Sequence, residues 1–235
     1  MRIRSKGFSI IWKLILLGFC TFGLLDGAGL LKGAYDADFP HMFTNVSNLF
    51  AWAYFLLATL RLIASRGDAG RPFAPQLKYT ATISLTVTML IAHFMLFDAM
   101  FQDGQLVWHL VAMHYVVPIM ALLDWLLFDE KGKMPAWGPF VWMSLVVGYL
   151  AVVMVCAGPL GLYMGGGTTA DISRYPYTFL DPEISGAGGV AAFCAAMLAA
   201  FVVLGYVLFA IDRLLGRIAA RSASREAPAK QKHMR

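Results

Sequence analysis

The stretch Leu106–Phe128, LVWHLVAMHYVVPIMALLDWLLF, is long and apolar enough to cross a bilayer as one helix. It also carries His109, His114 and Asp124. Ionisable groups in hydrocarbon cost about 3 kcal/mol each, so they usually face a bundle interior or a wet cavity. Pro118 has no N–H, so the carbonyl of His114 would lose its partner in a regular helix. We therefore predict a membrane-spanning helix that is kinked near a titratable side chain.

The composition of the whole chain is that of a membrane protein. Of its 235 residues, 59% are hydrophobic and 14% are charged, and a soluble protein needs more charges to cover its surface. The apolar residues gather in blocks of about 20 or more, which is the length that a helix needs to cross a bilayer. We predict an all-α fold, a polytopic bundle of six transmembrane helices at Phe8–Leu31, Met42–Ala64, Tyr79–Phe101, Leu106–Phe128, Gly138–Tyr163 and Gly188–Leu215.

Lysine and arginine predict the orientation of this bundle. They precede the first block, flank the loop after the second, follow the fourth and crowd the tail, whereas the other loops carry mainly aspartate and glutamate. Because basic loops stay in the cytoplasm, we expect both termini there, in a bacterial inner membrane. The N-terminus has the form of a signal peptide, but its apolar run continues to about Leu31 without a cleavage site, so we expect a retained first span.

We divide the chain into a transmembrane domain over residues 1–215 and a basic, disordered cytoplasmic tail over residues 216–235. The charge of the tail is typical of a topology signal, so we expect membrane lipid as a partner and no nucleic acid. Cys20, Cys156 and Cys194 all lie in apolar blocks, which favours packed thiols over disulfides or a zinc site. We expect no metal and no cofactor, and the oligomeric state stays open.

Polar residues of the third and fourth blocks gather near the loop that joins these blocks. His93 and His114 each lie about eight residues, or ~12 Å, from that loop, while Asp98 and His109 lie nearer to it. A tight turn over Gln102–Gln105 makes the two helices antiparallel neighbours. The sequence therefore predicts a polar pocket in the non-cytoplasmic half of the bundle.

The second block opens with polar residues on one helical face. Thr44, Ser47 and Asn48 stand at i, i+3 and i+4, with Asn45 beside them. These side chains can cap the helix and contact a neighbouring helix. Alternatively, Thr44 is a nucleophile, which requires a base such as histidine within hydrogen-bond reach. Thr44 lies about one turn into its span and His114 about two, a difference in depth of ~6 Å that helix tilt or a kink would have to close.

Several short motifs, in order along the chain, resemble the androgen-induced protein family of six-span membrane proteins and its bacterial relatives. They are Phe43-Thr44 with Ser47-Asn48, Met113-His114 before Pro118, Asp124-Trp125, and Tyr175-Pro176 with Phe179-Leu180-Asp181. The animal members are described as threonine hydrolases of esters between fatty acids and hydroxy fatty acids. The resemblance implies catalytic roles for Thr44 and His114. In the family the histidine stands one residue further from the proline, so His109 stays an alternative to His114.

The resemblance implies an integral membrane hydrolase of lipid or fatty-acid esters, in which His114 takes the proton of Thr44 and Thr44 attacks the carbonyl. Its oxyanion donor would be one of Asn45, Ser47, Asn48 and His93. Asp98 or Asp124 would orient a histidine, and the loop at Tyr175 would cover a lipid-like substrate. Two alternatives stay open, namely a non-enzymatic subunit or carrier that binds a lipid or quinone, and a small b-type cytochrome with His93 and His114 as haem ligands.

Overall fold

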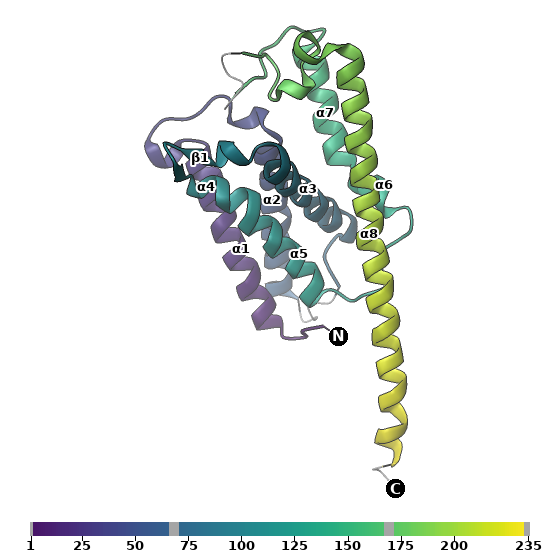
Figure 1. Ribbon diagram of the computed structural model, residues 1–235. Coiled ribbons are helices and arrows are strands. Elements are labelled where there is room, and N and C mark those ends of the chain that lie inside the picture. The colour runs from purple at the N-terminus through teal and green to yellow at the C-terminus, as the bar shows by residue number, and fades with distance from the viewer. Residues whose placement is uncertain (1, 66–70, 167–171, 233–235) are drawn as a thin grey trace.

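The structure is a computed structural model that describes residues 2–65, 71–166 and 172–232. It confirms the all-α class, because nearly every regular element is a helix (Figure 1). The α-helices are α1 (Lys6–Gly27), α2 (Phe43–Ala64), α3 (Pro75–Met95), α4 (Trp108–Val111), α5 (Val117–Phe128), α6 (Gly138–Trp142), α7 (Ser144–Ala157) and α8 (Pro182–Lys232). Short helical turns are η1 (Leu30–Lys32), η2 (Phe39–His41), η3 (Phe97–Met100), η4 (Ala112–Val116) and η6 (Thr178–Leu180), and strands β1 (Phe101–Gln102) and β2 (Gln105–Leu106) form a hairpin.

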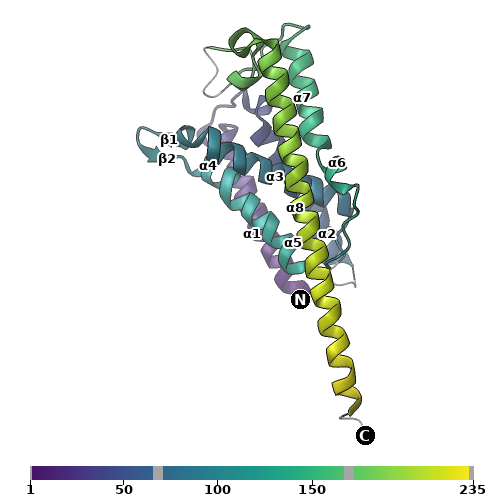
Figure 2. The ribbon, with the colours of Figure 1, turned by 45° about the vertical axis from the view of Figure 1, so that its right-hand side comes forward.

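Five helical segments of the described chain are long and apolar enough to cross a membrane. They are Lys6–Gly27, Phe43–Ala64, Trp108–Phe128, Gly138–Ala157 and Pro182–Ser222. The protein is therefore an integral membrane protein. The two ends of the chain lie at the same end of the molecule, where α8 projects beyond the other helices (Figures 1 and 2).

The polar composition of α3 keeps it outside these five segments, although α3 is among the most enclosed helices. Every residue from Lys78 to Thr88 is buried, and α3 packs against α2, α5 and α6. A helix that is enclosed by protein needs no apolar surface, provided that its polar groups are bonded. Thr82 donates to the Lys78 carbonyl at 2.9 Å and Thr86 donates to the Thr82 carbonyl at 2.7 Å. These two hydroxyls of α3 are thus satisfied within their own helix, and Thr88 bonds instead to Ser47 of α2.

The third expected span, Tyr79–Phe101, is shorter in the structure. Helix α3 ends at Met95, and η3 then leads into the hairpin, in which Phe101 pairs with Leu106 and Gln102 with Gln105. Asp103 and Gly104 form its turn with positive φ angles of 51° and 75°. Such angles suit a short polar residue followed by glycine. The tight turn predicted over Gln102–Gln105 is therefore present, but the chain leaves the helix before it.

The fourth expected span contains a π-helical turn, η4, between α4 and α5. The N–H of Val117 donates to the carbonyl of Ala112, five residues back, rather than to Met113 as in an α-helix. Pro118 has no N–H and cannot donate to Met113 in its place. The irregularity that Pro118 predicted thus takes the form of a widened turn around His114.

The last two expected spans, formed by α6, α7 and α8, lie together on one side of the other helices (Figures 1 and 2). The fifth span is divided at Met143, between α6 and α7, and α8 bends at Gly186, where φ is 70°. Helix α8 continues to Lys232. The alanines and arginines of residues 216–232 are strong helix formers. The division into a transmembrane domain and a basic, disordered tail stays a prediction. Residues 233–235 lie outside the described chain.

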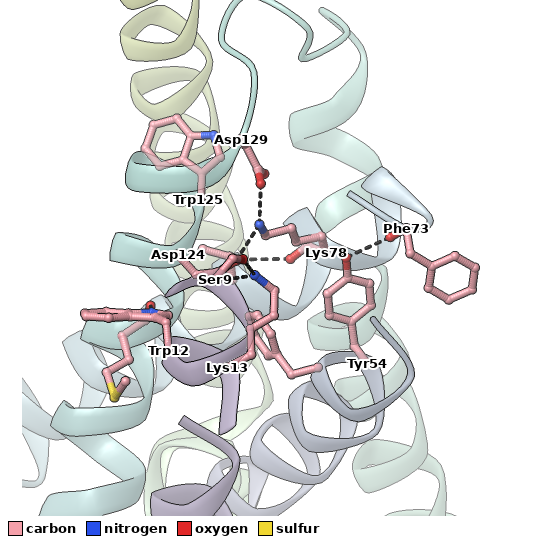
Figure 3. A network of polar contacts seen from close by, with 12 residues as sticks. Ser9, Trp12, Lys13, Tyr54, Phe73, Lys78, Asp124, Trp125 and Asp129 are labelled. Carbon is pink, nitrogen blue, oxygen red and sulfur yellow. Dashed lines mark hydrogen bonds and ion pairs between the residues drawn. The ribbon is translucent and has the colours of Figure 1, made fainter. Parts of the chain in front are cut away.

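Four buried charges join α1, α3 and the end of α5 near the N-terminal end of the molecule (Figure 3). Asp124 accepts from Lys13 Nζ and from Lys78 Nζ, each at 2.6 Å, and Lys78 also donates to Asp129 at 2.6 Å. Lys13 further donates to Ser9 Oγ at 2.8 Å. All four charged residues are at most 6% exposed, so each depends on the others for its stabilisation.

We predict that Lys78→Met destabilises the protein by about 3–5 kcal/mol, because Asp124 and Asp129 would stay buried with too few partners. Lys133→Met is the matched control, since the Lys133 side chain is 63% exposed and its pair with Glu130 is long, at 3.7 Å. The control should change stability by less than about 1 kcal/mol. Thermal unfolding of the detergent-purified proteins by circular dichroism measures both effects. Equal stability of the two variants would contradict the prediction.

Candidate functional site

Thr44 and His114 are in direct contact, with Thr44 Oγ1 at 2.9 Å from His114 Nε2. Thr44 lies in the first turn of α2 and is half-buried, and His114 lies in the π-helical turn and is 8% exposed. The other ring nitrogen, Nδ1, lies 2.8 Å from the carbonyl of Leu110. Because a carbonyl only accepts, Nδ1 carries the proton, and Nε2 presents its lone pair to the threonine hydroxyl. The pair therefore has the arrangement of a nucleophile with its base.

The side chain of Asn48 holds Thr44 and His114 close together, although the sequence predicted that they lie at different depths in the membrane. Its Nδ2 donates to the Thr44 carbonyl at 2.8 Å and to the Met113 carbonyl at 3.2 Å. The Met113 carbonyl is the one that the π-helical turn leaves without a donor from Val117. One amide group thus satisfies an unpaired carbonyl and ties α2 to the residue next to His114.

The neighbouring polar residues of α2 are also bonded to the protein. Ser47 Oγ contacts the Thr44 carbonyl at 3.0 Å and Thr88 Oγ1 at 2.8 Å. Asn45 Nδ2 donates to the carbonyl of Phe39 at 2.6 Å. Ser47 and Asn48 are fully buried, and Asn45 is 9% exposed. These side chains hold the start of α2 through bonds to carbonyls and to Thr88, and not by capping its N–H groups. Because their polar groups are already bonded, they are poorly placed as oxyanion donors.

Tyr177, a residue that the sequence did not single out, lies beside Thr44. Its hydroxyl oxygen accepts from the Phe43 N–H at 3.1 Å. Tyr149 adjoins this hydroxyl, but it donates its own proton to the His41 carbonyl at 2.8 Å. Burial raises the pKa of the Tyr177 hydroxyl to about 12, so the phenol keeps its proton. Tyr177 is therefore a neutral O–H donor next to the threonine.

Two partly open cavities meet at this pair of residues. The larger has a volume of about 770 Å³, and the smaller has a volume of about 80 Å³. The larger reaches the hairpin and the segment before α2, whereas the smaller runs between α3, α7 and α8. Both are lined by Thr44, Ala92, Leu96, His114 and Tyr177. A molecule bound across the two cavities would therefore pass the Thr44 hydroxyl.

His109 lies in the wall of the larger cavity, but it pairs with an acid that the sequence analysis missed. Its Nδ1 is 2.6 Å from Asp26 Oδ2, near the end of α1. In the structure, His114 is therefore the histidine that contacts Thr44, and His109 contacts Asp26 instead. Asp26 could have been recognised from the sequence, because it is an acidic residue within the apolar block Phe8–Leu31.

The remaining predicted residues lie further from the pair. His93 is exposed and bonds through Nδ1 to the Tyr115 hydroxyl at 3.1 Å. Tyr175 is buried in the core, and it is Tyr177, two residues later, that reaches the cavities. Asp98 is exposed and lines the larger cavity. Of these three residues, only Asp98 is among the described residues that line the two cavities.

Asp124 belongs to the buried charge cluster, and the partner that orients His114 is the Leu110 carbonyl rather than a carboxylate. The haem alternative gains no support from the geometry, since both nitrogens of His114 are bonded and His93 bonds to Tyr115. The described residues contain no group of three or more His, Cys, Asp or Glu that would hold a metal ion.

Comparisons of the chain with models of known protein families, with curated proteins and with solved structures found no match.

We predict that Asn48→Asp destabilises the protein by about 2 kcal/mol or more, because the Thr44 and Met113 carbonyls would lose the amide N–H groups of Asn48 and face a carboxylate. Gln105→Glu makes the same chemical change at an exposed position of the hairpin and should have little effect. Thermal unfolding in detergent distinguishes the two variants. A tolerated Asn48→Asp would show that the amide does not hold the π-helical turn.

Proposed function

We propose that this protein is an integral membrane hydrolase of lipid or fatty-acid esters, with Thr44 as nucleophile and His114 as base. The observation that carries the proposal is the 2.9 Å contact between Thr44 Oγ1 and the unprotonated His114 Nε2. A threonine hydroxyl is a weak nucleophile until a neighbouring base removes its proton. The low exposure of His114 favours this role, because the ring is held in one tautomer and away from bulk water.

In the proposed reaction, His114 Nε2 takes the proton of Thr44 as Oγ1 attacks the ester carbonyl. The tetrahedral intermediate collapses when the bond to the alcohol oxygen breaks, and His114 returns its proton to that oxygen. The acyl group then remains on Thr44. Water then gives a proton to His114 and attacks the acyl carbon. The bond between that carbon and Thr44 Oγ1 breaks, His114 returns the proton to Oγ1, and the fatty acid leaves.

Tyr177 is the residue that we expect to stabilise the negative oxygen of the tetrahedral intermediate. Its phenol is neutral, it adjoins Thr44, and it lines both cavities. A preorganised donor of this kind lowers the barrier because it is already aimed at the developing charge. The candidates suggested by the sequence alone, Asn45, Ser47 and Asn48, have their polar groups bonded to the backbone and to neighbouring side chains.

The proposal extends to topology and family. Helix α3 has 21 residues and is ~30 Å long, sufficient for a sixth span even though its polar side chains lower its hydropathy. Six spans and the distribution of Lys and Arg support the proposal that both termini lie on the cytoplasmic side of a bacterial inner membrane. The resemblance of its motifs to the androgen-induced protein family supports a relationship with that family.

The alternative function is that of a non-enzymatic protein that binds a lipid or quinone. The smaller cavity favours it, because its walls are largely the apolar side chains of α3, α7 and α8. The two functions differ in one respect, namely whether Thr44 forms a covalent bond with a substrate.

A fluorophosphonate probe with a long alkyl chain distinguishes them. We expect it to label Thr44 with loss of fluoride, to fail with Thr44→Ala, and to label His114→Ala about 10²–10⁴-fold more slowly. Thr59→Ala and His93→Ala are the matched controls, because Thr59 is buried far along α2 and His93 is exposed. Gel fluorescence and mass spectrometry of the adduct provide the measurement. Unchanged labelling of Thr44→Ala would exclude the proposed nucleophile.

We further expect Tyr177→Phe to lower kcat for an ester about 10²-fold, because one donor to the oxyanion is lost. Tyr175→Phe is the control, since Tyr175 lies outside both cavities. With the wild type, the rate should stay high above pH 10, the ordinary pKa of tyrosine, because the pKa of Tyr177 is raised to about 12. Hydrolysis rates measured against pH test both statements. Full activity of Tyr177→Phe would assign the oxyanion to another donor.

A further inference from the structure

The two cavities that meet at Thr44 and His114 differ in chemistry. The smaller is bounded mainly by aliphatic and aromatic side chains, among them Ile91, Leu150 and Phe201. Such walls suit a hydrocarbon chain, which gains from leaving water and forms no hydrogen bonds. The arm of a substrate that enters the smaller cavity is therefore apolar.

The larger cavity is lined by three aspartates, Asp36, Asp38 and Asp98, and by no lysine or arginine of the described chain. Asp36 and Asp98 are exposed, and the Asp38 side chain is 33% exposed, so these carboxylates add negative charge to the wall of the cavity. Asp38 Oδ1 also lies 3.7 Å from His41 Nδ1. Because no lysine or arginine of the described chain offsets these aspartates in the lining, the cavity favours positively charged or uncharged groups.

The other charges near this wall offset one another. His109 lies 2.6 Å from Asp26, and Lys32 lies 3.7 Å from the same carboxylate. The Lys32 side chain is 65% exposed, and Lys32 is not among the described residues that line the larger cavity. These groups give the larger cavity no free cation that would hold a carboxylate.

We infer that the substrate is an ester of a long-chain fatty acid with an uncharged or cationic alcohol. The part of its acyl chain next to the carbonyl lies in the smaller, partly open cavity, and its alcohol lies in the larger. This inference rests on the proposed function, because it requires the ester carbonyl at Thr44. It differs from what the family resemblance implies, since a hydroxy fatty acid carries a carboxylate that the three aspartates would repel.

The placement also agrees with the direction of the reaction. When the bond between the acyl carbon and the alcohol oxygen breaks, the alcohol receives its proton from His114 and is free in the larger cavity. The acyl group remains on Thr44, with its chain in the smaller cavity, until water cleaves it. The larger and more polar cavity is thus the place where alcohol leaves and water enters.

Three palmitoyl esters test the inference on the full-length protein in detergent. Their alcohols are choline, its uncharged isostere dimethylbutanol, and hydroxybutanoate, so the acyl chain is constant while the charge changes. We expect kcat/KM for the choline and dimethylbutanol esters to exceed that for the hydroxybutanoate ester at least about tenfold at low salt. The ratio should fall as salt approaches 1 M, where the screening length is ~3 Å.

Two variants connect this selectivity to the cavity. The double variant Asp38→Asn with Asp98→Asn should raise kcat/KM for the hydroxybutanoate ester about threefold or more relative to the dimethylbutanol ester. Asp103→Asn is the matched control, because Asp103 lies in the turn of the nearby hairpin and outside the cavity lining. The control should leave the ratio of the two rates unchanged.

A further variant tests the acyl arm. Leu150→Trp narrows the smaller cavity and should lower the ratio of the palmitoyl to the butyryl ester rate about tenfold. Val147→Trp places the same ring on the exposed face of α7 and should preserve that ratio.

The outcomes separate this inference from the proposed function. Equal rates for the anionic and uncharged esters, with Thr44 labelled by the fluorophosphonate, would overturn the substrate class and leave the hydrolase standing. Absence of both hydrolysis and labelling would overturn the hydrolase and the substrate class with it. Selectivity that disappears in the double aspartate variant and persists in Asp103→Asn would support the inference.

Discussion

The two bonds that Asp124 accepts from Lys13 and Lys78 constrain the packing of the helices around it (Figure 3). A carboxylate and two ammonium groups that are cut off from water are stable only together, so α1, α3 and α5 must meet with one rotation and one register. Asp129 adds a second acceptor for Lys78 and continues the cluster beyond the end of α5. The position of His114, further along the same span as Asp124, depends on that register.

At the other end of this span, the π-helical turn determines the position of His114 relative to Thr44. Pro118 removes a donor, the turn widens, and the Met113 carbonyl becomes available to Asn48. Because the same amide group also binds the Thr44 carbonyl, the start of α2 and the residue beside His114 are held together. An irregular segment of helix thus supplies the geometry for a nucleophile and its base, as is frequent for π-helical turns at functional sites.

The site lies between two environments that a membrane protein can offer to one substrate. The smaller cavity is bounded by apolar walls, and the larger contains carboxylates close to the loops. An ester has the same division, since its acyl chain is apolar and its alcohol is polar. The proposed hydrolase and the proposed substrate class therefore follow from one arrangement, in which Thr44 stands at the boundary between the two cavities.

Patterns in the amino-acid sequence predicted the all-α class, most of the helices, the turn at Gln102–Gln105, and the residue types of the candidate site. Hydrophobic blocks and turn residues act locally, and depth along a span follows from the constant rise of a helix. The same patterns could not predict that Thr44 contacts His114, that Tyr177 rather than Tyr175 lines the site, or that Asp124 pairs with lysines. The reason is that rotation about a helix axis and the register of the π-helical turn depend on packing between segments that are distant in the chain.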